Sequence, residues 1–173
     1  MKKSALGLVF IAFFAMAWAG AQEKPLGALE DAVFKTIWLE PHFGVFDNLS
    51  FRIDGSEVTL LGQAMLPLTK DNVAARVGKV PGVTKVNNEI EVLPLSENDD
   101  SIRLRAYRAL FGAADLFRYA LEVNPSIHII VKNGHLTLEG LVSTSSDAKR
   151  ALMAVRGVTG VFSVKNNLKA EKY

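Results

Sequence analysis

The stretch GVTGVFSVKNNL, residues 157–168, has a counterpart earlier in the chain, KVPGVTKVNNEI, residues 79–90. In both, a glycine precedes a valine-rich segment, and asparagines follow. Glycine permits a tight turn, and valine-rich segments are typical of β-strands. Each stretch is therefore expected to be the return from a helix into a strand that closes a small sheet.

These two stretches belong to a longer repeat. At an offset of 78, residues 49–90 align with residues 127–168 without a gap, and nine positions are identical. The matches fall at glycines and at alternating apolar positions, which specify a fold, and not at charged surface positions. A repeat of this length indicates a duplicated domain rather than a solenoid.

Each copy contains one hairpin. Apolar and polar residues alternate over residues 49–62 around Asp54-Gly55, and over residues 127–140 around Asn133-Gly134. Both dipeptides favour the positive φ angles of a tight turn. The apolar side chains of the paired strands are therefore expected to share one face, which forms the core.

Helices are expected on both sides of each hairpin. The helices that precede the hairpins are expected at residues 29–39 and 102–111, where apolar residues recur at helical spacing. The helices that follow are expected to begin at N-caps and to end at glycines in left-handed geometry. The expected caps are Thr69 and Ser146, and the expected terminating glycines are Gly78 and Gly157.

The first 21 residues have a different character. Two lysines, an apolar run over residues 6–18 and small residues at 19–21 are in the order of a secretory signal peptide. The run is shorter than the roughly 20 apolar residues that a membrane-spanning helix needs. We therefore expect export followed by cleavage.

The expected mature chain is formally neutral but uneven in charge. Residues 22–94 carry 7 basic and 10 acidic residues, and residues 95–173 carry 11 basic and 8 acidic residues. The second half is suited to an anionic surface, or the two halves attract each other. There are no cysteines, so the fold depends on its apolar core, and zinc or iron–sulfur sites built on thiolates are excluded.

Taken together, the repeat predicts an α+β protein of two tandem αββαβ domains with two layers each, a three-stranded mixed sheet packed on helices. The first domain is expected at residues 22–94 and the second at residues 101–173. Residues 95–100, which follow a proline and include an acidic run, are expected to form a short linker.

The repeated motif resembles the BON domain (bacterial OsmY and nodulation). The resemblance implies the αββαβ fold and, for tandem-BON proteins, a periplasmic, non-enzymatic role in envelope maintenance or stress protection, with binding to phospholipid membranes. The matching positions are scaffold positions, so the resemblance says more about fold than about function. In the second copy they are Val131, Asn133, Gly134, Leu136, Thr137, Leu138, Gly140, Gly157, Gly160, Val161, Val164, Asn166 and Leu168; in the first they are Asp54, Gly55, Val58, Thr59, Leu60, Gly62, Gly82, Val83, Val86 and Asn88.

The sequence offers no constellation for catalysis. Carboxylates fall at caps and turns, and the nucleophile elbow, the phosphate loop and the dinucleotide glycine pattern are absent. His128 and His135 are expected to approach each other across the second hairpin, but they lack the further ligands of a metal site. We therefore expect no enzyme activity, no cofactor, no metal and no nucleic-acid partner.

The leading expectation is a lipid-binding surface on the first helix of the second copy. Arginines beside aromatic rings bind anionic headgroups while the rings lie at the membrane interface. The first helix of the first copy, with Glu30 and Asp31, lacks this character. The candidate lipid-binding residues are Arg103, Arg105, Tyr107, Arg108, Phe111, Arg118 and Tyr119.

The alternative is a protein-interaction or adaptor module of an envelope complex. Ile130 and Leu61 are apolar on sheet faces where a solvated face would be polar, and His128 lies on the same face as Ile130. These three residues mark a contact either between the two copies or with a protein partner. Trp38, Phe43 and Phe46 are expected to be core residues.

Overall fold

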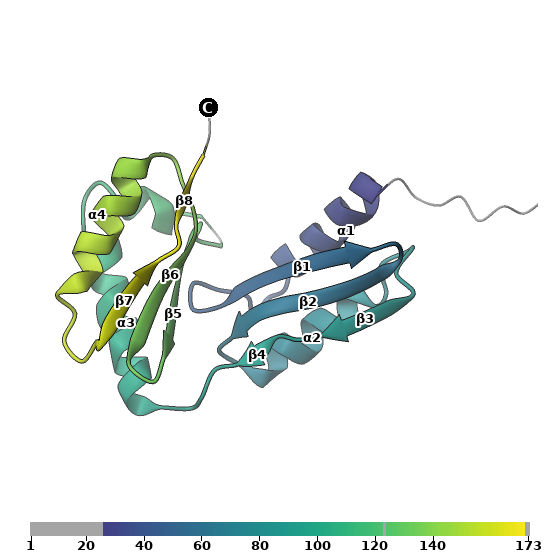
Figure 1. Ribbon diagram of the computed structural model, residues 1–173, viewed down its shortest axis with the longest axis horizontal. Helices are drawn as coiled ribbons and strands as arrows, with labels where there is room; N and C mark the ends of the chain where they lie inside the picture. The colour runs from purple at the N-terminus through teal and green to yellow at the C-terminus, as the bar shows by residue number, and fades with distance from the viewer. Residues whose placement is uncertain (1–25, 123, 172–173) are drawn as a thin grey trace, which may run out of the picture.

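The computed structural model describes residues 26–122 and 124–171, so the expected signal peptide lies outside the described residues. Figure 1 shows two α/β units of similar design, joined by one short connection, each with a small sheet backed by helices. We call them domain 1 and domain 2.

The order αββαβ is confirmed in both domains, and each carries one further short strand. Domain 1 consists of α1 (Leu26–Trp38), β1 (Asn48–Asp54), β2 (Glu57–Ala64), α2 (Pro67–Val77), β3 (Lys85–Asn88) and β4 (Glu91–Val92). Domain 2 consists of α3 (Glu97–Phe111), the 3-10 helix η1 (Phe117–Ala120), β5 (Ile127–Lys132), β6 (His135–Val142), α4 (Ser145–Arg156), β7 (Ser163–Asn166) and β8 (Lys169–Ala170).

The two sheets have the same topology. In domain 1, β2 is central; it pairs antiparallel with β1 and parallel with β3, and β4 continues the parallel pairing further along β2. In domain 2, β6 pairs in the same way with β5, β7 and β8. The predicted α+β fold with two mixed sheets is therefore confirmed.

Two hairpin turns follow the expected chemistry with one difference. Asn133 and Gly134 both have positive φ, 52° and 76°, and connect β5 to β6. In domain 1, Asp54 instead pairs with Glu57, so the turn is Gly55-Ser56 and only Gly55 has positive φ. The glycine therefore takes the strained position in both hairpins.

The predicted helix ends were wrong. Helix α2 begins at Pro67, whose missing N–H and fixed φ suit the first turn, and Thr69 is buried inside that helix. The cap of α4 is Thr144, whose hydroxyl accepts a hydrogen bond from the Asp147 N–H, and not Ser146. Gly78 and Gly157 follow their helices with φ of −62° and −90°, so neither uses left-handed geometry.

The connection between the domains is shorter than expected. Helix α3 begins at Glu97 because the Ser96 hydroxyl caps it by accepting from the Asp99 N–H. Most of the expected linker, residues 95–100, is thus the first turn of a helix. The expected bounds of the two domains otherwise stay a prediction.

Each domain has its own core. In domain 1, Leu29, Val33 and Ile37 of α1 pack with Val58 and Leu60 of β2. In domain 2, the buried faces of β5 and β6 pack on α3 and α4; their core residues are Ile102, Ala106, Leu110, Ile127, Ile129, Val131, Leu136, Leu138, Ala151 and Val155. The predicted sharing of one face by the apolar residues of each hairpin is confirmed by the register.

The loop that precedes β1 links the two domains (Figure 1). The Ile129 N–H of β5 donates to the Val45 carbonyl at 2.7 Å, and the Asn124 side chain donates to the Trp38 carbonyl at 2.7 Å. The Phe43 ring stacks on the His128 imidazole with centroids 5.3 Å apart. Domain 1 therefore adds backbone to the free edge of the sheet of domain 2.

The three aromatic residues expected in a core lie in or near this loop. Phe43 is buried, whereas Trp38 and Phe46 are half-buried. Phe46 packs on the core of domain 2 and lies against Tyr107, with centroids 6.3 Å apart. Phe46 therefore belongs with the core of domain 2 and not with that of domain 1, and Phe43 contacts domain 2 through His128.

Candidate membrane-binding face

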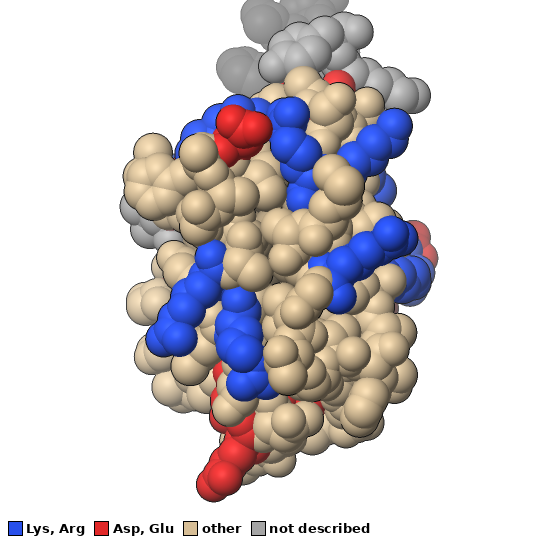
Figure 2. Space-filling view, turned by 90° about the vertical axis from the view of Figure 1, so that its left-hand side faces the viewer, with Lys and Arg blue, Asp and Glu red and all other residues tan. Residues whose placement is uncertain are grey.

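The outer surface of domain 2 carries a cluster of cations on three helical segments, α3, η1 and α4. Figure 2 shows Lys and Arg side chains spread over this end of the molecule, with few acidic residues among them. Two large apolar side chains are exposed on the same helices: Leu104 of α3 is 52% exposed and Met153 of α4 is 64% exposed. We define the basic helical face as Arg105, Arg108, Arg118, Lys149, Arg150 and Arg156 together with Leu104 and Met153.

Only part of the predicted lipid-binding set lies on this face. Arg105 and Arg108 of α3 and Arg118 of η1 reach the surface. Lys149, Arg150 and Arg156 were missed because the sequence argument considered only the first helix of the repeat. The signal that identifies them is visible in the sequence: cations at positions 149, 150 and 156 surround Met153 on the polar side of α4.

Arg103 is a correction to the predicted set. It is 2% exposed, its Nη2 donates to the Val131 carbonyl at 2.7 Å, and its Nη1 pairs with Asp100. The position borders the apolar stripe of α3, three residues before Ala106 and seven before Leu110, and β5 covers it. Arg103 is therefore a structural cation and is not available to lipid.

Two aromatic residues of the predicted set are also buried. Phe111 ends α3 inside the core of domain 2, and Tyr119 of η1 is buried with its hydroxyl bonded to the Asp147 carboxylate at 3.0 Å. Tyr107 is half-buried and packs edge-to-face on Phe111, with centroids 4.9 Å apart. None of these rings is free to insert into a membrane interface.

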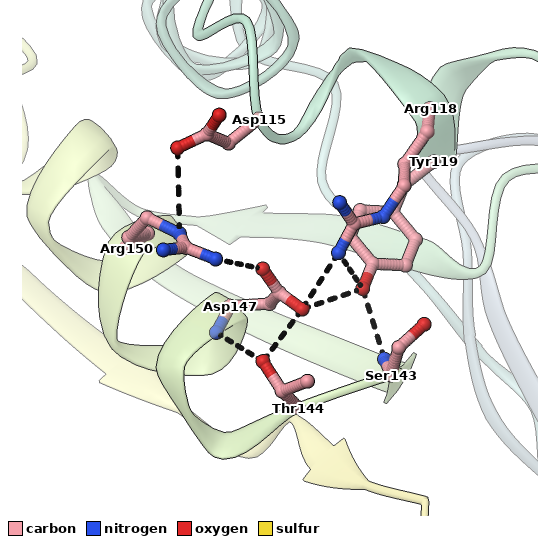
Figure 3. Close-up of polar contacts among 7 residues, drawn as sticks. All are labelled: Asp115, Arg118, Tyr119, Ser143, Thr144, Asp147 and Arg150. Atoms are coloured by element: carbon pink, nitrogen blue, oxygen red, sulfur yellow. Dashed lines mark hydrogen bonds and ion pairs between the residues drawn. The ribbon is translucent and has the colours of Figure 1, made fainter.

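Asp147 holds two of the arginines of the face (Figure 3). Arg118 Nη2 lies 2.8 Å from its carboxylate, and Arg150 Nη2 lies 2.5 Å from it. Burial alone would raise the pKa of the Asp147 carboxyl, but hydrogen bonds from Arg150, Thr144 and Tyr119 and the charge of Arg118 outweigh it. They hold the pKa of Asp147 well below its ordinary value.

The remaining cations of the face are less restrained. Arg105 Nε donates to the Thr159 carbonyl at 3.2 Å, which fixes its direction but leaves its charge uncompensated. Within the described residues, Arg108, Lys149 and Arg156 take part in no ion pair. These three are exposed, and together with the half-buried Arg105 they provide the net positive charge with which the face can attract an anionic surface.

Comparison with known proteins identifies the repeat. The model of the BON domain matches twice, over residues 28–94 and 99–172. The chain belongs to the BON domain family. Domain 1 and domain 2 are therefore BON domain 1 and BON domain 2, as the resemblance of the two sequence repeats implied.

The other comparisons are distant. No curated protein matches the chain. It is similar to the C-terminal domain of CdsD, a structural protein of the Type III secretion system of Chlamydia trachomatis, at 13% identity and a TM-score of 0.30, over 83% of this chain and 98% of that chain. It is similar to the PrgH periplasmic domain at 14% identity and a TM-score of 0.29, over 83% of this chain and 72% of that chain. Scores this low carry no argument about this protein.

The predicted protein-interaction residues lie on the facing sheets of the two BON domains or at the contact between them. His128 and Ile130 are buried, and His128 contacts domain 1 through Phe43 and the Gly44 carbonyl, 3.2 Å from Nδ1. Burial lowers the pKa of His128, although the Gly44 hydrogen bond opposes this shift. Leu61 is half-buried on β2. Of the two expected kinds of contact, the one between the copies is thus present at His128.

The two histidines of the second hairpin do not approach each other, which corrects the prediction. His128 pairs with Glu139 and His135 pairs with Lys132, at opposite ends of the hairpin. The exposed His135 ring instead bonds to the Ser163 hydroxyl at 2.7 Å. Among the described residues there is no group of three potential metal ligands.

A cleft of about 430 Å³ lies between the sheets of the two BON domains. Its walls carry both charges, and Glu91 of domain 1 pairs with Lys132 of domain 2 across it. The remaining lining residues are Gln63, Leu93, Ile130, Asn133, His135, Thr137, Glu139, Lys165 and Asn167.

No helix among residues 26–122 and 124–171 is long and apolar enough to span a bilayer.

Proposed function

We propose that this protein is exported to the periplasm and binds anionic phospholipid membranes peripherally through BON domain 2, as a non-enzymatic envelope protein. The observation that carries the proposal is the basic helical face, where cations from three helical segments surround two exposed apolar side chains. Membership of the BON domain family and the order of residues 1–21 support the location.

The expected attraction is modest and depends on salt. A Lys or Arg near an anionic leaflet contributes about 1 kcal/mol, so Arg108, Lys149 and Arg156, the exposed cations of the face without ion pairs, contribute about 3 kcal/mol together. Salt weakens this term because the Debye length at physiological ionic strength is about 8 Å. Leu104 and Met153 add burial of apolar surface, which salt does not screen.

BON domain 1 is the internal comparison for this proposal. The exposed positions of α1 include Glu30 and Asp31, and residues 22–94 have an acidic excess. Any membrane contact made by electrostatic attraction should therefore orient BON domain 2, and not BON domain 1, toward an anionic surface.

The test is sedimentation of the mature protein with vesicles of phosphatidylcholine alone and with vesicles that also contain phosphatidylglycerol. The variant is the triple change Arg108→Glu, Lys149→Glu and Arg156→Glu. We expect the mature protein to bind only the anionic vesicles, to dissociate as salt rises, and to lose binding in the variant.

A matched control separates the site from total charge. Lys35→Glu, Arg52→Glu and Lys79→Glu change the same number of exposed cations on BON domain 1. The control should retain most of its vesicle binding. Equal losses in the two triple variants would show that net charge, and not the basic helical face, attracts the membrane.

The interdomain cleft favours a second candidate function, binding a segment of an envelope protein as an adaptor. Its mixture of apolar, amide and charged side chains is suited to a polypeptide. A photo-crosslinking residue in place of His135, which is exposed in the cleft, should yield one discrete adduct in periplasm, while the same residue in place of Lys35 should not. Identical adduct patterns at both positions would count against the cleft.

A further inference from the structure

Strand β5 is an edge strand of the sheet in BON domain 2, and its outer side is covered. On the side of β5 that faces away from β6, the Ile129 N–H donates to Val45 of the other domain and the Val131 carbonyl accepts from Arg103. Val45 and Phe46 pack on the core beside this edge. The core-facing side chains of β5 are consequently sealed: Ile127, Ile129 and Val131 are each 0% exposed.

Among residues 26–122 and 124–171, nothing bonds to the equivalent edge of BON domain 1. Leu49, Phe51 and Ile53 of β1 occupy the same places in the repeat as these three residues of β5, yet all three are only partly buried. Phe51 pairs with Leu60 as Ile129 pairs with Leu138, so its N–H also points away from the hairpin. No described residue bonds to it there.

Part of this difference arises because BON domain 1 has no arginine at the position equivalent to Arg103. Leu29 of α1 and Ile102 of α3 occupy equivalent positions. Each lies 3.5 Å from the place that a Cβ would take on the turn glycine of its own domain, Gly82 or Gly160. The next residues are Glu30 and Arg103. Glu30 is exposed and has no donor for a carbonyl of β1, so this strand keeps the open edge that proteins usually protect.

Two observations point to a second copy of this chain as the cover. In BON domain 1, the loop between the first helix and the hairpin covers β5. In BON domain 2, the loop before the β5–β6 hairpin holds the equivalent position in the repeat. On that loop Phe117 is 53% exposed and Leu121 is 68% exposed. The acidic excess of residues 22–94 and the basic excess of residues 95–173 favour contact between unlike domains and disfavour pairing of two β1 edges.

We propose that the β1 edge of BON domain 1 binds the loop of BON domain 2 that carries Phe117 and Leu121 in a second copy, repeating the contact made within the chain. The contact is heterologous, because the two surfaces differ. Successive copies therefore add head to tail and form chains or rings rather than a closed dimer of two identical faces.

Light scattering coupled to size exclusion tests this on the mature protein over a wide range of concentrations. The edge variant is Phe51→Pro, which removes an outward N–H that the hairpin does not use. Ile53→Lys, which directs a charge inward at the same edge, replaces it if Phe51→Pro does not fold. The loop variant is Phe117→Ser with Leu121→Ser, and its control is Leu95→Ser with Phe162→Ser, which are also exposed.

We expect the mature protein and the control to form oligomers that grow with concentration and shrink with salt, and the edge and loop variants each to stay monomeric. A mixture of the two variants should stop at a one-to-one dimer, because one intact edge meets one intact loop. A mature protein that is monomeric at millimolar concentration would overturn the proposal. So would a loop variant that still dimerises by itself, which would indicate pairing of two β1 edges.

Discussion

Replacement of Arg103 separates a structural arginine from the membrane-binding ones. Its guanidinium is buried, donates to the Val131 carbonyl and pairs with Asp100. Burial raises the pKa of Asp47 in the other domain, and the positive charge of Arg103 opposes that rise. Arg103→Glu would place a carboxylate among these groups with no donor to satisfy it.

The expected cost follows from these contacts. Asp100 is 47% exposed, so loss of its ion pair costs little by itself. An uncompensated charge at the buried position 103 costs about 3–5 kcal/mol, of which the lost charged hydrogen bond to Val131 accounts for about 1.5–3 kcal/mol. Arg103→Met should cost only the latter amount or less, because it introduces no charge and because Arg103 Nε has no hydrogen-bond partner to lose. A domain stable by about 5–15 kcal/mol would then stay folded in both variants.

Urea unfolding followed by circular dichroism measures the free energy of unfolding, and vesicle sedimentation of the folded protein measures binding. We expect Arg103→Glu to lower the unfolding midpoint strongly and Arg103→Met to lower it less, while both folded variants still bind anionic vesicles. An Arg103→Glu protein with an unchanged midpoint and no vesicle binding would refute the reasoning, because it would place Arg103 on the membrane-binding surface.

Three further predictions concern stability. Asp147→Asn should lower the free energy of unfolding by about 2–3 kcal/mol at neutral pH. Because the pKa of Asp147 is lowered in the folded protein, the contribution of its carboxylate to stability is lost as pH falls through the folded pKa. A difference in unfolding free energy between the two proteins that stays constant down to strongly acidic pH would contradict this. Phe43→Ala should separate the domains, seen as two thermal transitions instead of one; a single unshifted transition would show that the loop does not couple them. Gly140→Ala, at φ 114° and against the Ser126 carbonyl, should destabilise by at least about 2 kcal/mol, whereas Gly157→Ala, with nothing within 4 Å, should leave the melting temperature nearly unchanged.

The fold was predictable because its determinants are local and repeated. Alternating apolar residues fix which face of each hairpin is buried, and Asn133-Gly134 fixes where it turns. The helix ends were less predictable, since several residues near each end can act as a cap. Helix α2 begins at Pro67, two residues before Thr69, and α4 is capped by Thr144, two residues before Ser146.

The candidate site was predicted only in part because exposure depends on neighbours outside the helix. Arg103 stands three residues before Ala106 and seven before Leu110, so it borders the buried face of α3, and Phe111 follows Leu110 at the end of the helix. They are buried by β5 and by a loop from the other domain, about 60 residues away in the sequence. Helical periodicity identifies the buried face of one helix, but it does not report how far neighbouring elements extend the burial beyond that face.

The contacts between domains also bear on how weak membrane binding becomes useful. The loop from BON domain 1 covers β5, whereas α4 lies on the side of BON domain 2 away from this loop (Figure 1). Arg108, Lys149 and Arg156 are exposed while the domains are joined. One copy gains only about 3 kcal/mol from these three cations. Copies joined through the β1 edge would bind one membrane together, and their affinities would reinforce each other. The variant Phe51→Pro leaves every cation in place, so it should bind anionic vesicles more weakly than the mature protein at high concentration and equally well at low concentration. Equal binding at every concentration would mean that each copy acts alone.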